Sequence, residues 1–216
     1  MHKIPKKIHQ IWVGNYEIPE QVKICMSSVK EKFHDFEYFF WNNDNIPKMP
    51  KNVYEQFNKY GRLGIPAFQA DILRLHVLNV YGGIFLDADF LVRKNFYETI
   101  TKPFWCVIAN EKTRRHVFNG IFACEPNNPI LSKLLSEMKD EPLGGKGLQG
   151  HGPLLLSNYI REFARIPKDY NIYQHLKSNP HDYIQCDSHM EFENGSYTKH
   201  YFLGSSKLPS AWKNNL

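Results

Sequence analysis

One stretch of the sequence decides the fold, Tyr81-Gly82-Gly83-Ile84-Phe85-Leu86-Asp87-Ala88-Asp89. A glycine pair ends a preceding helix, and the unbroken apolar run 84–86 is typical of a strand buried on both faces. In an extended chain residues i and i+2 point to the same side, so we expect Asp87 and Asp89 to reach one hard cation. A divalent metal that carries a phosphorylated ligand would compensate the two carboxylates. The stretch therefore predicts a metal site where a core strand ends, although solvated turn carboxylates have the same pattern.

A buried helix is predicted directly before this strand. Residues 66–80 open with a proline and carry apolar side chains at helical spacing, namely Phe68, Ile72, Leu75 and Leu78. Asp71 and Arg74 lie three residues apart and therefore share one face of this helix. Taken alone, the pair is equally well interpreted as an ordinary structural ion pair.

The composition bounds the class of protein. The chain has 216 residues, 42% of them hydrophobic and 14% aromatic, which is enough for one globular domain over residues 1–216. No apolar run reaches the ~18 residues that a membrane span needs, and residues 1–7 lack the apolar core of a signal peptide. We therefore expect a soluble, cytoplasmic protein. A basic, aromatic-rich surface would also suit peripheral contact with the inner face of a membrane.

Net charge limits the classes of binding partner, and cysteine spacing limits the possible zinc sites and disulfides. The net charge of +5 fits an anionic small molecule, a membrane surface or nucleic acid. The basic residues are scattered and form no block typical of a nucleic-acid arm, so nucleic acid is not expected as a partner. The four cysteines are far apart in sequence and form no CxxC pair, which favours reduced thiols over a zinc site or a disulfide framework: Cys25, Cys106, Cys124 and Cys186.

The order of predicted elements indicates an α/β fold. We expect strands at 8–14, 38–41, 84–87, 105–109 and 117–124, and helices at 19–33, 53–60, 66–80, 130–138 and 154–163. The strand, helix and strand at the start predict a parallel βαβ unit in a mixed, mainly parallel sheet. The glycine-rich stretch 141–152 lacks the residue order of a P-loop and is interpreted as a loop. Residues from 179 onward are predicted to be irregular.

Several separated motifs together resemble one enzyme family. They are Ile4-Pro5-Lys6-Lys7-Ile8-His9-Gln10-Ile11-Trp12-Val13-Gly14, Ala70-Asp71-Ile72-Leu73-Arg74 and the stretch 81–89, with weaker matches at Gly152-Pro153, His200 and Ser210-Ala211-Trp212. The pattern resembles the nucleotide-sugar glycosyltransferases with a DXD sugar-binding region, which include Och1-like mannosyltransferases, capsular-polysaccharide transferases and, more distantly, the glucosylating clostridial toxins. The resemblance implies a GT-A type fold, a Rossmann-like α/β sandwich that binds a nucleotide-diphosphate sugar and Mn²⁺ or Mg²⁺ at the carboxyl ends of its strands.

The resemblance also implies which residues bind the donor. Gln10, Ile11 and Trp12 match the first strand, whose end meets the nucleotide base and ribose. A core position is an equally good interpretation of Trp12. Asp71 and Arg74 match residues that contact the sugar hydroxyls and the phosphates of the donor.

A second set of matches concerns the metal and the diphosphate. Asp87 is expected to hold the ribose or a metal-bound water, and Asp89 to ligate the metal directly. His200 matches a late histidine that would complete a mixed nitrogen and oxygen site suited to manganese. Ser210 and Trp212 match a closing Ser-x-Trp that caps the diphosphate with a hydroxyl and an indole N–H. The spacing between His200 and this Ser-x-Trp is longer than the family pattern.

The expected activity is that of a metal-dependent, retaining hexosyltransferase. It would use a UDP-sugar rather than a GDP-sugar and act on a glycan, a lipid-linked glycan or a protein. No carboxylate can be placed as a nucleophile, which favours front-face attack with the leaving phosphate as base. Asn119 and Gly120 are either sugar contacts or structural turn residues. A non-catalytic nucleotide-sugar or carbohydrate-binding module of the same fold is the alternative, whereas a DxD phosphohydrolase is disfavoured because Leu91 occupies the position of its hydroxyl residue.

Overall fold

Helices and strands alternate along most of the chain. The computed structural model describes residues 4–109, 116–138, 152–188, 192, 195–201 and 203. The helices are α1 (Glu20–Lys32), α2 (Lys51–Arg62), α3 (Pro66–Tyr81), α4 (Pro129–Ser136), α5 (Pro153–Ala164) and α6 (Ile172–Ser178). The strands are β1 (Lys7–Ile11), β2 (Glu37–Trp41), β3 (Gly83–Leu86), β4 (Phe90–Val92), β5 (Phe104–Ile108), β6 (Val117–Cys124), β7 (Ile184–Asp187) and β8 (Thr198–His200).

The central sheet is mixed and mainly parallel, as predicted. Its six strands lie in the order β2-β1-β3-β6-β5-β7, while β4 and β8 form a separate two-stranded ribbon. β1 runs parallel to β2 and β3, and β7 runs parallel to β5, whereas β6 is antiparallel to both of its neighbours. The predicted parallel βαβ unit is thus formed by β1, α1 and β2. Because β1 and β3 are adjacent and parallel, their carboxyl ends meet at one edge of the sheet.

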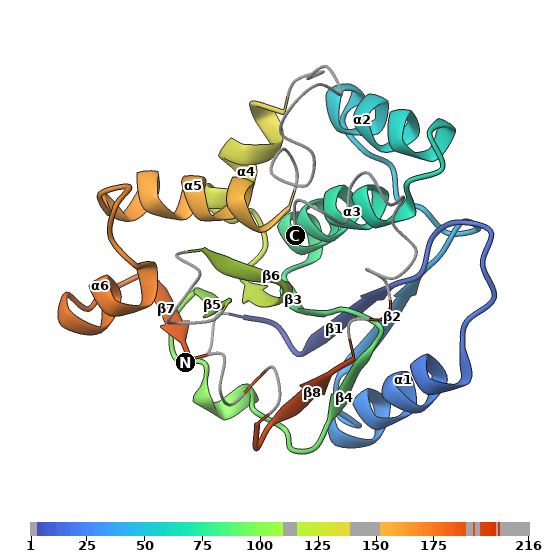
Figure 1. Cartoon of the computed structure of the whole chain (residues 1–216), viewed down its shortest axis with the longest axis horizontal. Helices are drawn as coiled ribbons and strands as arrows, with labels where there is room; N and C mark the ends of the chain where they lie inside the picture. The colour runs from blue at the N-terminus through green and yellow to red at the C-terminus, as the bar shows by residue number, and fades with distance from the viewer. Residues whose placement is uncertain are drawn as a thin grey trace.

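Each face of the sheet has its own hydrophobic core. Helices α2 to α6 supply one cluster, which Phe85 and Phe122 join from the sheet, whereas α1 and β4 contribute to the other with Ile84 and Leu86. Figure 1 shows α2 to α5 on one side of the sheet and α1 with the β4–β8 ribbon on the other. Successive residues of β3 therefore point into different cores, which explains why this strand is apolar at every position.

The buried helix α3 leads straight into β3, as the sequence predicts. Pro66 occupies the first turn, where its missing N–H costs no hydrogen bond, and residues 71–78 are all buried. The helix ends at Gly82, which has φ 62° and ψ −175° and donates its N–H to the carbonyl of Leu78. This backbone conformation is essentially restricted to glycine.

Replacing Gly82 with alanine is therefore expected to destabilise the protein strongly. An added Cβ would lie 2.7 Å from the backbone nitrogen of Pro126, and the backbone conformation is itself strained for alanine. We expect a loss of ~3 kcal/mol in the free energy of unfolding, measured by urea denaturation. Gly64→Ala is the matched control, because Gly64 has a similar φ of 68° with nothing within 4 Å of the new Cβ, and it should cost only about 1 kcal/mol. Equal losses in the two variants would contradict this account.

His9 ties β1 to the turn between α3 and β3. Its ring is fully buried, accepts a hydrogen bond from Nε1 of Trp41 at 3.1 Å and lies 2.8 Å from the carbonyl oxygen of Gly82. Because the indole N–H only donates, Nδ1 of His9 is the acceptor and Nε2 carries the proton that is donated to Gly82. Burial lowers the pKa of His9 to about 4, although the bond to Gly82 opposes this shift.

The lowered pKa of His9 predicts a loss of stability in acid. Between pH 6.5 and 4 the unfolded state binds a proton that folded His9 does not bind, so this contribution is complete above pH 6.5 and disappears as the pH falls. We expect it to amount to ~3 kcal/mol. His9→Phe keeps a ring in the same stack and removes the titration, so its unfolding free energy should depend less steeply on pH than that of the wild type. Parallel pH profiles of the two proteins would refute the assignment.

Three strands were not expected from the sequence. β4, β7 and β8 have only three or four residues each, and two of them lie in the part of the chain that we predicted to be irregular. Short strands with mixed polarity carry little periodic signal, and their partners are distant in sequence.

The first strand also ends at Ile11 rather than at Gly14. No helix in the described part of the chain combines the length and apolar character that crossing a bilayer requires.

Candidate active site

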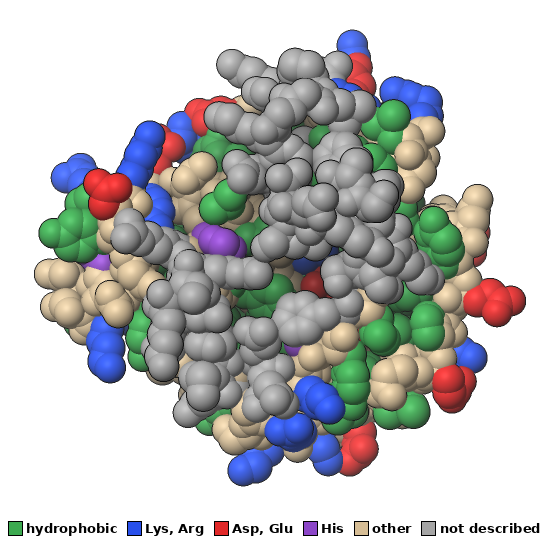
Figure 2. Space-filling model, viewed as in Figure 1, with side chains coloured by type: hydrophobic (Ala, Val, Ile, Leu, Met, Phe, Trp, Pro, Cys, Tyr) green, Lys and Arg blue, Asp and Glu red, His purple; other side chains and the backbone are tan. Residues whose placement is uncertain are grey.

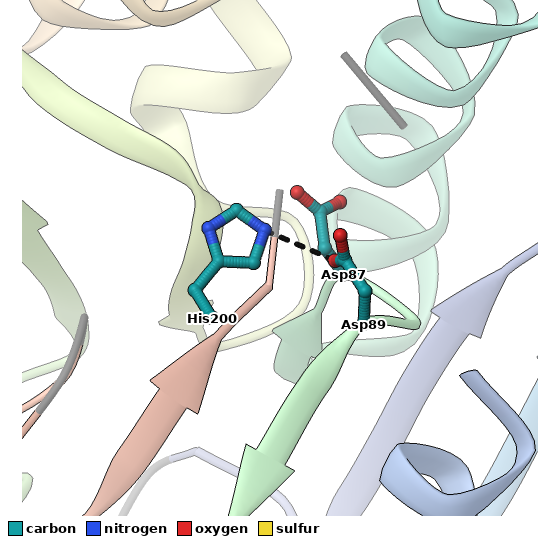
Figure 3. A group of neighbouring side chains, drawn as sticks. All are labelled: Asp87, Asp89 and His200. Carbon is teal, nitrogen blue, oxygen red and sulfur yellow. Dashed lines mark hydrogen bonds and ion pairs between the residues drawn. The ribbon is translucent and has the colours of Figure 1, made fainter. Parts of the chain in front are cut away.

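Two carboxylates and an imidazole meet beside the end of β3. Asp87 follows β3, Asp89 precedes β4, and His200 ends β8, which pairs with β4 so that His200 lies opposite Phe90. One ligand atom from each of Asp87, Asp89 and His200 lies within 4.8 Å of the others, and Figure 3 shows the three side chains grouped together. Within the described ranges this is the one group of three or more acidic, histidine or cysteine side chains with such spacing.

The two aspartates converge for a different reason from the one we predicted. They were expected to lie on an extended strand, but residues 87–89 form a turn closed by a hydrogen bond from the Phe90 N–H to the Asp87 carbonyl at 3.1 Å. The chain has to turn here because β3 belongs to the main sheet and β4 to the small ribbon. The two side chains do come together, but through a turn and not through the strand geometry that we predicted for them.

Asp89 is held by an extensive set of hydrogen bonds. Its Oδ1 lies 3.0 Å from Nε2 of His200, its Oδ2 accepts the Leu203 N–H at 2.7 Å, and its carbonyl accepts the Tyr201 N–H at 3.2 Å. Burial by itself would raise the pKa of Asp89, but the interactions with His200 and Leu203 outweigh it and leave the pKa below its usual value. The His200 ring stacks on Phe90 with a centroid distance of 4.3 Å. The last described residues of the chain thus wrap around a carboxylate that remains charged.

Arg74 supplies the positive charge that faces these carboxylates. It is buried, and its Nη2 lies 3.1 Å from Oδ1 of Asp71 and 3.2 Å from Oδ1 of Asp87. Its Nη1 donates to the Asn119 carbonyl at 2.7 Å, and its Nε donates to the Ala70 carbonyl at 3.2 Å. The guanidinium therefore makes more than the simple ion pair within a helix that the sequence also allowed, because it bridges α3, β6 and the turn at residues 87–89.

Burial changes the acidity of the carboxylates around Arg74. It raises the pKa of Asp71 to about 6, with the neighbouring charge of Asp87 acting in the same direction and Arg74 opposing both. Burial also raises the pKa of Asp87, again against the effect of Arg74. Asp71 and Asp87 thus share one guanidinium, and the Asp89 carboxylate lies close to Asp87, so the group gains from an additional cation.

Asn119 and Gly120 lie in β6 rather than in a turn. The pairing of β5 with β6 shifts between Cys106 and Val107, where β6 carries extra residues. Such bulges are common beside active sites because they redirect side chains. The Asn119 amide donates to Asp71 Oδ1 at 2.8 Å, and the Gly120 carbonyl accepts the Asp87 N–H at 2.8 Å. Both residues support the aspartates in this structure.

Gly120 leaves room for the Asp87 carboxylate. A Cβ added at Gly120 would lie 2.5 Å from Oδ2 of Asp87, and its other close neighbours belong to the Phe118 ring. Since both are ends of side chains, Gly120→Ala should displace the carboxylate without disrupting the sheet. We expect a loss of ~10-fold or more in metal affinity, measured by calorimetry, with a change in melting temperature of only a few degrees. Unchanged metal affinity would contradict a role of Asp87 in the site.

The N-terminal motif at residues 4–14 lies next to the group formed by Asp87, Asp89 and His200. Gln10 is fully buried; its Nε2 donates to the Asp87 carbonyl at 3.3 Å, and its Oε1 accepts the Tyr38 hydroxyl at 2.8 Å. Ile11 belongs to the hydrophobic core, whereas Trp12 is partly exposed and donates Nε1–H to the Tyr16 carbonyl at 2.9 Å. Direct contact of these residues with a donor stays a prediction. Tyr38 was not identified from the sequence, where it is one aromatic residue of an ordinary strand.

A hollow of about 420 Å³ lies beyond the ends of the first two strands. Its lining comes from the loops after β1 and β2 and from α2 and α3: Gly14, Asn15, Tyr16, Asn43, Gly61, Gly64, Pro66 and Gln69. The Asn43 amide holds the rim together, because it accepts the Gly14 N–H at 3.0 Å and donates to the Gly14 carbonyl at 3.1 Å. The hollow thus follows directly on the motif that ends at Gly14.

Two predicted features cannot be placed. Ser210 and Trp212 lie outside the described residues, as does the glycine-rich stretch up to residue 151. Figure 2 shows positive and negative side chains interspersed around the rim of one face, in agreement with the scattered charge of the sequence.

The donor set fits a divalent cation. Carboxylate oxygens are ligands that Mg²⁺ and Mn²⁺ prefer, and an imidazole nitrogen is accepted by manganese and by later transition metals. Asp87, Asp89 and His200 would hold the ion from one side, since their ligand atoms are close together and come from neighbouring segments. The negative charge that the single guanidinium of Arg74 leaves on Asp71 and Asp87 favours the same occupant.

Comparisons with known proteins agree with one another. A family model described as capsular polysaccharide synthesis protein matches residues 1–140. An uncharacterized glycosyltransferase of Acanthamoeba polyphaga mimivirus is 32% identical over 62% of this chain and 55% of its own length. Inositol phosphoceramide mannosyltransferase 2 of Schizosaccharomyces pombe is 25% identical over 98% of this chain and 59% of its own length. The chain therefore spans little more than half of these curated relatives.

Solved structures share the fold. The PaToxG glycosyltransferase superposes with a TM-score of 0.62 at 21% identity, over 81% of this chain and 75% of that one. The UDP-bound glycosyltransferase domain from the YGT toxin superposes with a TM-score of 0.55 at 12% identity, over 98% of this chain and 88% of that one. The predicted GT-A type α/β fold is confirmed.

Proposed function

The chain belongs to the capsular polysaccharide synthesis protein family, and from this premise we propose that it is a metal-dependent glycosyltransferase domain that transfers a hexose from a nucleotide-diphosphate sugar. The observation that carries the proposal is the meeting of Asp87, Asp89 and His200 beside the buried guanidinium of Arg74. A merely structural acidic turn would not need three segments of the chain to converge on it.

The donor is a UDP-sugar in preference to a GDP-sugar, and the metal is Mn²⁺ or Mg²⁺. The structurally similar domain from the YGT toxin is UDP-bound, and the mixed nitrogen and oxygen ligand set suits manganese. The names of fungal relatives keep mannose among the sugars to be tested. The hollow near Gly14 is adjacent to Trp12 in the chain and is the place we assign to the nucleotide base.

Each residue of the site has its own role in the proposed reaction. Asp87, Asp89 and His200 would hold a divalent cation, which would supply positive charge to offset the negative charge on the leaving diphosphate. Arg74 is already fixed by four polar contacts. Its side chain does not have to reorganise in order to present positive charge to the phosphates or to the sugar ring. Asp71, held by Asn119 and Arg74, orients sugar hydroxyls. We propose transfer with retention by front-face attack, in which the leaving phosphate acts as the base.

The acceptor is a glycan, a lipid-linked glycan or a protein. Fungal relatives whose names refer to inositol phosphoceramide make a lipid-linked acceptor the first class to test. A cytoplasmic location with peripheral contact at a membrane would bring the domain to such an acceptor. A non-catalytic nucleotide-sugar or carbohydrate-binding module of the same fold is the second candidate, and hydrolysis of a donor distinguishes the two.

A donor panel tests the proposed function. The protein is incubated with Mn²⁺ and a series of UDP- and GDP-sugars, and the released nucleotide is measured. We expect slow hydrolysis of one donor, which stops on chelation with EDTA and returns with added Mn²⁺. If no donor is hydrolysed and no nucleotide raises the melting temperature in the presence of Mn²⁺, the enzyme proposal and the nucleotide-sugar-binding proposal both fail. Binding without hydrolysis, also in the presence of acceptor extracts, would favour the binding module.

A further inference from the structure

Two of the four cysteines lie next to each other in the folded sheet although 80 residues separate them. Cys106 on β5 and Cys186 on β7 are direct partners in the parallel register of these strands. Neighbouring strands are about 4.8 Å apart, and the Cα atoms of disulfide-bonded cysteines are ~4.4–6.8 Å apart. The backbone therefore already places the pair at a separation that a disulfide can span.

The side chains of the pair also point the same way. Cys106 belongs to the core on the helical face of the sheet, and Cys186 packs against that same core. Burial and, after it, the neighbouring Cys186 thiol raise the pKa of Cys106. The Cys106 thiol also donates to the Gln185 carbonyl at 3.6 Å. Both cysteines are free thiols in the structure.

The pair differs from the other two cysteines in its access to solvent and in the residues that lie opposite it in the sheet. Cys186 is only partly buried and lies on β7, which pairs with β5 alone among the described strands and ends the sheet. Cys25 is buried in α1, and Cys124 is buried in β6 with Gly83 and Phe104 as its register partners. Neither has a cysteine opposite it, so the protein contains its own internal control.

We propose that Cys106 and Cys186 are a redox-active thiol pair that closes to a disulfide between β5 and β7 when the protein meets a low-molecular-weight disulfide oxidant. The Cys186 thiolate attacks the oxidant, forms a mixed disulfide and releases one thiol. The Cys106 thiolate then attacks the Cys186 sulfur and expels the second thiol, so that two electrons pass from the pair to the oxidant. Because Cys106 is buried, the second step needs local opening of the edge strand β7. This proposal does not depend on the proposed glycosyltransferase activity.

The test uses the full chain and oxidised glutathione. The protein is incubated with an excess of oxidised glutathione, unfolded, alkylated with iodoacetamide and mapped by mass spectrometry. We expect a peptide that links Cys106 to Cys186, loss of two of the four titratable thiols, and recovery of all four with dithiothreitol. The closed form should melt ~5 °C or more above the reduced form, because the bond constrains the unfolded chain.

Matched variants decide between this pair and the alternatives. Cys186→Ser should prevent the cross-link, whereas Cys124→Ser should leave it unchanged, and circular dichroism verifies that both variants fold. Four free thiols after prolonged oxidation, a cross-link between other cysteines, or a glutathione adduct on Cys186 that never resolves would each overturn the proposal. None of these outcomes depends on donor hydrolysis.

Discussion

Asp89→Asn is expected to lower metal-dependent donor hydrolysis at least ~100-fold while leaving the fold intact. The amide keeps an oxygen that accepts the Leu203 N–H and a group that contacts His200, so the local hydrogen bonds are largely retained. What disappears is the negative charge that is preserved at this position by a lowered pKa. Metal affinity, measured by calorimetry, should fall in parallel with hydrolysis, because both depend on the same carboxylate.

The control for this variant is an exposed carboxylate. Asp169 lies on the surface between α5 and α6, and Asp169→Asn changes the net charge by the same amount. It should leave hydrolysis and metal affinity within experimental error. If Asp89→Asn retained more than a third of wild-type hydrolysis at saturating Mn²⁺, Asp89 would not be a metal ligand.

Arg74→Leu is expected to destabilise the protein by ~3–5 kcal/mol and to abolish donor hydrolysis. The variant removes the single described cation that contacts both Asp71 and Asp87, and it leaves these carboxylates uncompensated in a buried place. Urea denaturation should show the loss most clearly at pH 7.5. The deficit should shrink toward pH 5, because Asp71, with a pKa already raised to about 6, takes up a proton there.

Arg74→Lys separates charge from geometry. Lysine retains the positive charge but cannot reach the Ala70 carbonyl, the Asn119 carbonyl and the carboxylates together as the guanidinium does. We expect it to recover most of the stability and little of the hydrolysis. A leucine variant as stable as the wild type would show that Arg74 does not hold the two carboxylates in place.

The fold could be predicted because its signals are local. Pro66 at a helix start, the glycine pair at its end and the apolar run 84–86 each specify one element without reference to the rest of the chain. The N-terminal βαβ unit follows from the same kind of local pattern. β7 and β8 could not be found in this way, since these short strands are defined by partners at β5 and β4 that are more than 75 residues away.

The site was predicted in part. Asp71, Arg74, Asp87, Asp89 and His200 were all named from the sequence, and the structure brings them together. Their contacts were not predictable, because Asp87 and Asp89 meet across a turn and because part of the support comes from backbone groups, which leave no trace in residue identity. The roles of Gln10, Ile11 and Trp12 toward a donor stay predictions.

The most direct test of the central claim is electron paramagnetic resonance of Mn²⁺ titrated with the protein, with and without UDP. The signal of free Mn²⁺ should fall by the amount that corresponds to one binding site per chain. The protein should bind Mn²⁺ more tightly when UDP is present, and the signal should fall far less with Asp89→Asn. A free Mn²⁺ signal that the wild-type protein does not reduce, with or without nucleotide, would contradict the metal site formed by Asp87, Asp89 and His200.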